Sequence, residues 1–280
     1  MLKAGVVGCG HLGKIHIKLL IQSENYSLLG VYDKDDAICK SVAKEFGCKP
    51  YESFEQMLDD INILDIVTPT PYHFNYAIKA IEKGVHVFIE KPVCTNTEES
   101  LQLIEFSKLN NVKIQVGHVE RFNPAFTAIE KNINKPMFIE SHRLAQFNPR
   151  GTDVSVVLDL MIHDIDIILN SVKSPIKQIS SSGVSVISDS PDIANARIEF
   201  ENGCVANLTA SRVSLKNMRK TRFFQSGKYI SVDFLKRESQ IIEIDEKKSD
   251  PIMVLETEEG NKKKIYFNKA VVNERNAILD

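Results

Sequence analysis

The stretch Val85-His86-Val87-Phe88-Ile89-Glu90-Lys91-Pro92 decides the fold of this 280-residue chain. Its β-branched and aromatic residues predict a short strand, and the preceding Gly84 marks the point where that strand begins. The strand ends in two opposite charges and a proline. Open α/β sheets bind ligands at the carboxyl ends of their strands, so this position predicts that Lys91 faces a ligand crevice. A surface ion pair at a strand end is the alternative interpretation.

A second motif lies near the amino terminus, where an apolar strand over Ala4–Val7 runs into Gly8-Cys9-Gly10-His11-Leu12-Gly13. A helix follows, and this order of strand, G-x-G-x-x-G and helix is typical of dinucleotide binding. Gly8 permits a tight turn, Gly10 lets the backbone approach a pyrophosphate, and Gly13 lets the helix pack closely on the strand. The amino terminus of the helix then offers free N–H groups and a positive dipole end to the phosphates. Glycines in an unliganded α/β turn are the alternative.

An acidic residue at the end of the second strand indicates which dinucleotide binds. Leu28–Tyr32 is predicted to form this strand, and Asp33 follows it, 20 residues past Gly13. A carboxylate there can accept hydrogen bonds from the diol of an adenosine ribose, and it repels a 2′-phosphate. The sequence therefore predicts NAD, with NADP as the less favoured cofactor. After a buried strand over residues 63–67, the rigid turn Thr68-Pro69-Thr70-Pro71 is expected to lie over the same crevice.

The rhythm of strands and helices divides the chain into two predicted domains. Strands and helices alternate over residues 1–123, which predicts an α/β Rossmann domain with a doubly wound parallel sheet. One long helix over about residues 153–170 is followed by strand-like runs, so residues 124–280 are predicted to form an α+β domain with a mostly antiparallel sheet. A final helix is expected over residues 270–280. It stops without a cap, so a natural tail is expected to be missing.

Composition narrows the class of protein. Hydrophobic residues make up 43% and charged residues 26% of the chain, values of an ordinary soluble globular protein. The net charge of −2 and the lack of a long basic tract argue against a nucleic-acid partner. No apolar run reaches the roughly 20 residues that a membrane span needs, which argues against a membrane protein. Five cysteines without a C-x-x-C pair predict reduced thiols and a cytoplasmic location.

The predicted long helix carries a second candidate site. Two stripes run along it at helical spacing, one apolar and one polar, rotated by one residue. Such a polar stripe is usually a solvated face, but a histidine with a nearby carboxylate can also accept a proton near neutral pH. A metal site is a third interpretation, and no metal is predicted because no further clear ligand is present. The apolar stripe comprises Leu158, Ile162, Ile165 and Leu169, and the polar stripe comprises Asp159, His163, Asp166 and Asn170.

Together, these motifs resemble those of the Gfo/Idh/MocA family of sugar and cyclitol oxidoreductases. The resemblance covers nearly the whole chain and rests on the glycine loop, on Thr68-Pro69-Thr70-Pro71-Tyr72-His73, on Glu90-Lys91-Pro92, and on Asp159 with His163. It implies a nicotinamide cofactor and a substrate alcohol that Lys91 and His163 face, with Asp159 supporting them. It also implies a homodimer or homotetramer, because the sheet of the second domain often serves as an oligomer interface in this family.

Two further stretches, residues 116–124 and 156–164, resemble family members that act on UDP-N-acetylglucosamine at C3. A nucleotide-sugar substrate is therefore expected, and arginines are candidate donors to its diphosphate because guanidinium groups are planar forks. Each of these arginines is equally well interpreted as an ordinary surface residue. Another polyol or free sugar, such as inositol, is an alternative substrate. A non-catalytic NAD-binding regulator on the same fold is an alternative of another class, although such a regulator needs neither Lys91 nor His163.

The resemblance completes the set of candidate site residues. Cofactor contacts are expected from Gly8, Gly10, His11, Leu12, Gly13, Asp33, Thr68, Pro69, His73, Glu90 and Lys91. Substrate contacts are expected from Lys91, Arg121, Asn123, Arg143, Arg150 and His163. Catalytic roles are expected for Lys91, His163 and Asp159.

Overall fold

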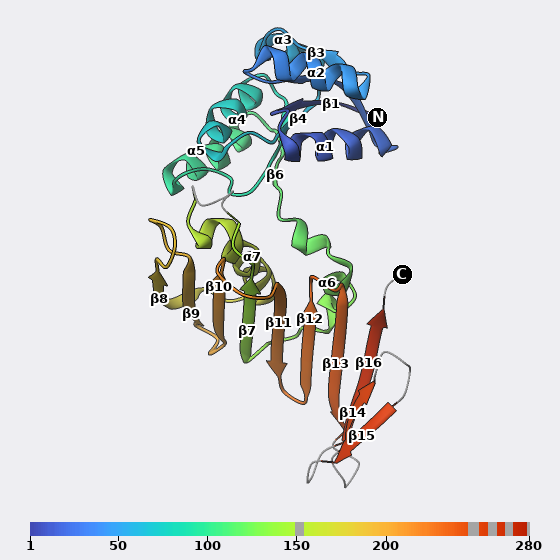
Figure 1. The fold of residues 1–280 in the computed structure, drawn as a ribbon, viewed down its shortest axis with the longest axis vertical. Coiled ribbons are helices and arrows are strands. Elements are labelled where there is room, and N and C mark those ends of the chain that lie inside the picture. Colours follow the sequence, from blue (N-terminus) through green and yellow to red (C-terminus); the bar gives the residue numbers. More distant parts are fainter. Residues whose placement is uncertain (149–153, 246–251, 257–261, 267–270, 279–280) are drawn as a thin grey trace. The chain divides into compact units, whose positions relative to one another are not determined.

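The computed structural model describes residues 1–148, 154–245, 252–256, 262–266 and 271–278 of the chain (Figure 1). The chain forms two compact units, Met1–His118 and Val119–Asp280. The first is built around a parallel sheet and the second around a mostly antiparallel one, which confirms the predicted fold class. Among the described residues, no helix is long and apolar enough to cross a membrane.

The sheet of the first unit has six strands in the order β3-β2-β1-β4-β5-β6, and each neighbouring pair is parallel. The strand order reverses between β1 and β4, and open α/β sheets bind ligands at such a switch point. The strand predicted before Lys91 is β5, an interior strand of this sheet. The strands are β1 (Leu2–Val7), β2 (Tyr26–Tyr32), β3 (Lys49–Pro50), β4 (Ile63–Ile66), β5 (His86–Ile89) and β6 (Ile114–Val116).

Helices cover both faces of this sheet, as a doubly wound fold requires. On one face, Val6 of β1 packs in a cluster with Ile17 of α1 and Val42 of α2. On the other face, the next residue, Val7, packs with Met57 of α3 and with residues of α4 and α5. The helices are α1 (His11–Gln22), α2 (Asp36–Phe46), α3 (Phe54–Asp60), the 3₁₀ turn η1 (Thr70–Tyr72), α4 (His73–Glu82) and α5 (Thr97–Leu109).

Local signals set the ends of these helices. The Asp35 side chain accepts hydrogen bonds from two amides in the first turn of α2, and Gly47 ends that helix in the left-handed conformation with a φ of 68°. Ser53 caps α3, because its hydroxyl accepts a hydrogen bond from the Gln56 amide. Asn96 caps α5 in the same way.

The described residues of the second unit form a ten-stranded sheet in the order β15-β14-β16-β13-β12-β11-β7-β10-β9-β8 (Figure 1). The pair of β7 with β10 and the pair of β14 with β16 are parallel, and the other pairs are antiparallel. A hairpin at Glu201-Asn202-Gly203 joins β9 and β10. The strands are β7 (Phe138–Leu144), β8 (Ile176–Val184), β9 (Ile193–Phe200), β10 (Val205–Ser211), β11 (Met218–Gln225), β12 (Lys228–Asp233), β13 (Glu238–Asp245), β14 (Ile252–Glu256), β15 (Lys262–Tyr266) and β16 (Val271–Ile278).

The long helix predicted over residues 153–170 begins later and packs differently. A π-helical turn, η4 (Val157–Met161), leads into α7 (Ile162–Ser171). The expected apolar stripe is wrong at both ends, because Leu158 and Leu169 are 40% and 44% exposed. Met161, Asp164 and Ile168 are buried instead, and an acidic residue can take a core position here because a cation meets it there. The remaining short helices are η2 (Val119–Phe122), α6 (Pro124–Thr127) and η3 (Glu130–Asn132).

The helix predicted over residues 270–280 is also wrong. Residues Val271–Ile278 form the strand β16, which pairs with β13 in antiparallel register. Pairing along β13 satisfies the backbone groups of this segment, and that tertiary contact outweighs its local composition.

Candidate functional site

The glycine loop of the first unit has the geometry that a bound pyrophosphate needs. Gly8 adopts a φ of +101°, and a Cβ there would lie 2.6 Å from the carbonyl oxygen of Val67. A Cβ on Gly13 would overlap the Gly8 carbonyl oxygen, so α1 packs closely only because this position has no side chain. Gly10 differs, because a Cβ there would meet nothing within 4 Å. The space beside Gly10 is therefore open to a ligand at the start of α1.

Asp33 lies directly beside this loop. One of its carboxylate oxygens accepts a hydrogen bond from the Cys9 amide at 2.7 Å, and the other accepts one from the Asp35 amide at 3.0 Å. Each carboxylate oxygen retains a second lone pair for a ribose hydroxyl. The first turn of α1 begins with the exposed residues His11 and Leu12, and no side chain caps it.

The turn after β4 presents a buried hydroxyl. The Thr68 Oγ1 atom is buried and has no hydrogen-bond partner within the part of the chain that the structure describes. Leaving such a group unpaired is costly, so a ligand that hydrogen-bonds to it would be stabilised. Pro69, which follows, is exposed. The open space at Gly10, the uncapped turn of α1 and the Thr68 hydroxyl together fit a dinucleotide.

His73 occupies a different environment from the other predicted cofactor residues. It is 1% exposed, and its two ring nitrogens lie 2.7 Å from the carbonyl oxygen of Thr68 and 2.9 Å from that of Pro92. Its polar atoms are therefore engaged by the backbone of two neighbouring loops.

Lys91 is the second residue of the loop after β5, and Glu90 is the first. Its backbone amide donates a hydrogen bond to Glu90 Oε2 at 3.1 Å, and its side chain is partly buried. Glu90 is 8% exposed and packs against Gly117, where a Cβ would lie 2.6 Å from Glu90 Oε1. The acidic neighbour of Lys91 is therefore enclosed, which argues against the interpretation of this strand end as a surface ion pair.

His16, on α1, lies between two buried carboxylates. Its Nδ1 is 2.9 Å from Oδ2 of Asp65, in β4, and its Nε2 is 3.4 Å from Oε1 of Glu90. Burial alone would lower the pKa of His16, but hydrogen bonds and charge attraction from the two carboxylates outweigh it and raise the pKa to about 10. His16 is therefore a cation at neutral pH.

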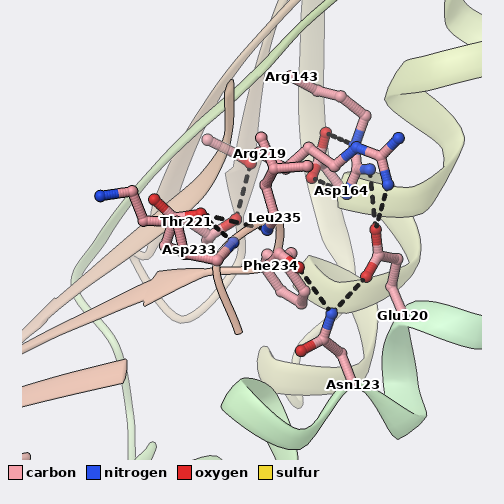
Figure 2. A network of polar contacts seen from close by, with 11 residues as sticks. Glu120, Asn123, Arg143, Asp164, Arg219, Thr221, Asp233, Phe234 and Leu235 are labelled. Atoms are coloured by element: carbon pink, nitrogen blue, oxygen red, sulfur yellow. Dashed lines mark hydrogen bonds and ion pairs between the residues drawn. The ribbon is translucent and has the colours of Figure 1, made fainter. Parts of the chain in front are cut away.

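In the second unit, Arg143 lies at the centre of a buried polar network, which Figure 2 shows. Arg143 is 2% exposed, its Nε and Nη2 donate to Asp164, and its Nη1 donates to Glu120 at 2.9 Å. Burial acts against the guanidinium charge, but the two carboxylates outweigh it and raise the pKa of Arg143. Glu120 also accepts a hydrogen bond from Asn123, which donates to the Phe234 carbonyl as well. The Arg143 guanidinium, which was expected to bind a diphosphate, therefore holds α7 against β7.

Arg121 makes a second fork-shaped contact with α7. Its Nε and Nη2 donate to the two carboxylate oxygens of Asp166 at 2.7 Å and 2.5 Å, and 45% of its side chain remains exposed. Asn123 also caps α6, because its side-chain oxygen accepts a hydrogen bond from the Ala125 amide. Arg150 lies outside the described residues.

His163 is the second residue of α7 and follows the π-helical turn that contains Asp159. Such turns are frequent at functional sites. The next two acidic residues, Asp164 and Asp166, form ion pairs with Arg143 and Arg121. These two ion pairs fix the rotation of α7 about its own axis, and with it the direction in which position 163 faces. His163 itself is half-buried.

The sequence-based predictions missed the charged partners in both units. Asp65 carried a usable signal, because a carboxylate inside the apolar strand Ile63–Ile66 must find a cation or a donor. Asp164 and Glu120 carried little, since acidic residues in helical turns are usually exposed. Among the residues that the structure describes, no group of three His, Cys, Asp or Glu side chains could hold a metal ion.

Comparison with family models accounts for both units. Residues 2–118 match an oxidoreductase family with an NAD-binding Rossmann fold, and residues 133–228 match the C-terminal domain of the Gfo/Idh/MocA family. A UDP-N-acetylglucosamine 3-dehydrogenase of Acidithiobacillus ferrooxidans is 37% identical over 235 residues, which span 84% of this chain and 74% of that protein. A scyllo-inositol 2-dehydrogenase (NAD(+)) of Bacillus subtilis is 32% identical, over 76% of this chain and 68% of that protein.

Solved structures give the same assignment. A structure of the UDP-N-acetylglucosamine 3-dehydrogenase from Acidithiobacillus ferrooxidans superposes with a TM-score of 0.83 and 36% identity, covering 86% of this chain and 80% of that one. A second crystal form of the same enzyme has a TM-score of 0.84 and covers 94% of this chain and 82% of that one, at 33% identity.

The open space at Gly10 predicts how two glycine substitutions will differ. Gly10→Ala should leave the melting temperature nearly unchanged and weaken NAD binding on the order of tenfold or more, because the methyl group would occupy the place of the pyrophosphate. Gly13→Ala should instead lower the free energy of unfolding by about 1–3 kcal/mol, because its methyl group overlaps backbone. Calorimetric titration with NAD and thermal unfolding measure the two effects. Unchanged NAD affinity in Gly10→Ala would contradict a cofactor seated on this loop.

His16 should make the fold less stable at alkaline pH. Its pKa rises from the ordinary 6.5 to about 10 on folding, so its contribution is complete below pH 6.5 and is lost as the pH rises through 10. The free energy of unfolding in urea, measured from about pH 6 to pH 10, should therefore fall more steeply for the wild type than for His16→Gln. His86→Gln is the control, since the His86 ring accepts a hydrogen bond from the Lys113 amide. Equal slopes for wild type and His16→Gln would show that His16 is not a cation.

Proposed function

The chain belongs to the Gfo/Idh/MocA family of NAD-binding oxidoreductases, and we propose that it transfers a hydride between C3 of UDP-N-acetylglucosamine and NAD. The observation that carries this proposal is the 37% identity to an enzyme named for that reaction. The 235 aligned residues are more than either unit contains, so the likeness includes parts of both.

Lys91 is proposed to stabilise the negative charge that develops on the substrate oxygen as the alcohol is oxidised. Its place after β5, at the carboxyl end of a parallel strand, supports this role because ligands bind there in open α/β sheets. An ammonium group in a partly buried site is more effective than one in water, since the surroundings screen its charge less. NAD, when bound, supplies the acceptor for the hydride.

His163 is proposed to accept the proton of the substrate hydroxyl, and Asp159 to orient its ring. The anchoring of α7 through Asp164 and Asp166 supports this assignment, because a general base must be held in a fixed direction. Part of the Arg121 side chain stays exposed beyond its contact with Asp166. Of the two candidate arginines that the structure describes, Arg121 and Arg143, we therefore propose Arg121 as the donor to the diphosphate.

A polyol is the second candidate substrate. The scyllo-inositol 2-dehydrogenase that matches this chain at 32% identity favours it, and the roles of Lys91 and His163 would be the same. A non-catalytic NAD-binding regulator is the candidate of a different class. Because regulators on this fold need no proton acceptor, substitution of His163 separates the two classes.

We also propose that the protein is a homodimer or homotetramer in the cytoplasm. The face of the second sheet that carries Ile139, Phe223 and Ile230 packs into the core of its unit. On the opposite face, Phe138, Phe224 and Tyr229 form an aromatic cluster, and such a patch favours contact with another chain. All five cysteines are free thiols, which suits a reducing compartment.

The substrate and cofactor are tested together by absorbance at the reduced-nicotinamide band. UDP-N-acetylglucosamine, N-acetylglucosamine and scyllo-inositol are supplied separately, each with NAD and with NADP. We expect the highest kcat/KM for UDP-N-acetylglucosamine with NAD, and weaker binding of NADP because Asp33 repels its 2′-phosphate. Faster turnover of scyllo-inositol would establish the polyol candidate. Binding of NAD without turnover of any substrate would favour the regulator.

Substitution of the two candidate catalytic residues should lower turnover without loss of NAD binding. Lys91→Ala should reduce kcat on the order of 10²-fold or more, and His163→Ala by roughly 10²–10⁴-fold. His163→Asn should have a kcat nearly as low as that of His163→Ala, since an amide does not accept a proton at neutral pH. Lys113→Ala, at an exposed lysine, is the matched control and should turn over normally. Near-normal kcat in Lys91→Ala would make that ammonium structural.

A further inference from the structure

The loop that carries Lys91 is held from opposite faces of the sheet. His16 lies on α1, which packs on one face, and His73 begins α4, which packs on the other. The two histidines reach the residues on either side of Lys91: His16 contacts the Glu90 side chain, and His73 contacts the Pro92 carbonyl oxygen. Lys91 is thus the middle residue of a three-residue segment with a histidine at each end.

The contact on the α1 face runs through charge. Glu90 Oε1 faces His16 Nε2 at 3.4 Å, and Glu90 Oε2 accepts the hydrogen bond from the Lys91 amide at 3.1 Å. One carboxylate therefore joins the imidazolium to the backbone of Lys91. With Asp65 on its other nitrogen, His16 also ties this segment to β4. An uncompensated Glu90 at 8% exposure would be strongly destabilising, so its place depends on His16.

The contact on the α4 face runs through backbone carbonyls. The ring of His73 lies between the Thr68 and Pro92 oxygens, at 2.7 Å and 2.9 Å. Both ring nitrogens are thus in hydrogen-bonding range of a backbone carbonyl, one on each loop. His73 therefore couples the turn after β4, where the cofactor candidate Thr68 lies, to the loop after β5.

We propose that His16 and His73 are positioning residues that clamp the segment Glu90–Pro92 and so fix the direction of the Lys91 side chain. This inference rests on the proposed function, in which Lys91 acts on the substrate oxygen. Neither histidine needs to touch the reacting atoms. A single contact would leave the segment free to pivot about it, whereas contacts from two faces oppose that motion. A misplacement of about 1 Å can reduce turnover on the order of 10²-fold.

The first test compares three histidine variants of the whole protein with UDP-N-acetylglucosamine and NAD. His16→Gln removes the cation, and His73→Leu removes both ring nitrogens at similar volume. Each should lower kcat by about 10- to 100-fold and leave the Kd for NAD within about threefold. His86→Gln is the control, because His86 lies at the opposite end of β5 and contacts the Lys113 amide. This variant should keep kcat within about twofold of the wild type. If the other variants acted by weakening β5 in general, His86→Gln would lower kcat as well.

A double substitution tests whether His16 acts through Glu90. If it does, adding His16→Gln to Glu90→Gln should lower kcat by much less than His16→Gln does alone, because the link is already broken. Independent, multiplicative effects of the two substitutions would overturn this arm of the clamp.

A second measurement needs no substrate and keeps the proposal testable if a variant is poorly active. Trace labelling with acetic anhydride, followed by mass spectrometry, gives the reactivity of Lys91 relative to the exposed Lys108 and Lys113. We expect this ratio to change at least about threefold in His16→Gln and His73→Leu, and not in His86→Gln. If Lys91→Ala abolishes turnover while both clamp variants keep full kcat and an unchanged ratio, the clamp is refuted and the proposed function stands. If Lys91→Ala turns over normally, the proposed function fails, and the labelling ratio alone decides whether the clamp exists.

Discussion

The burial of two carboxylates beside one imidazolium is the constraint on which the first unit depends. Asp65 lies in β4, Glu90 directly follows the adjacent strand β5, and His16 lies on α1. Their like charges would repel within the sheet, and His16 lies between them. The cation thus fixes two strand ends and a helix relative to one another, at the edge where open sheets bind ligands.

The second unit uses the same principle with a guanidinium. Arg143 lies between Glu120 and Asp164, and Figure 2 shows the network closing through Asn123 to the carbonyl oxygen of Phe234. In both units the buried acid is the immediate neighbour of a candidate catalytic residue, Glu90 of Lys91 and Asp164 of His163. A functional side chain can then point away from the core, because its neighbour in the chain carries the anchoring contact.

Short-range signals made the first unit predictable. The glycine loop, Asp33 and the strand before Lys91 each depend on residues within one βαβ unit, and the family models agree with that outline. Contacts between distant residues were not predictable from spacing, such as that of His16 with Asp65, 49 positions apart. The same limit explains why Leu158 and Leu169 were wrongly predicted to be buried. Helical periodicity shows that residues form a stripe, but it does not show which of two neighbouring stripes faces the core when a buried ion pair is present. This limit also explains Val271–Ile278, where pairing with β13 decided between helix and strand.

The position of β7 in its sheet has a consequence for the order in which the units form during synthesis. β7 comes first among the strands of the second unit, yet its partners β10 and β11 end at Ser211 and Gln225. The first unit has all its strands once residue 118 has left the ribosome. The sheet of the first unit can therefore form while β7 still lacks both of its neighbouring strands. The core around Arg143 is complete only after more than eighty further residues have been added.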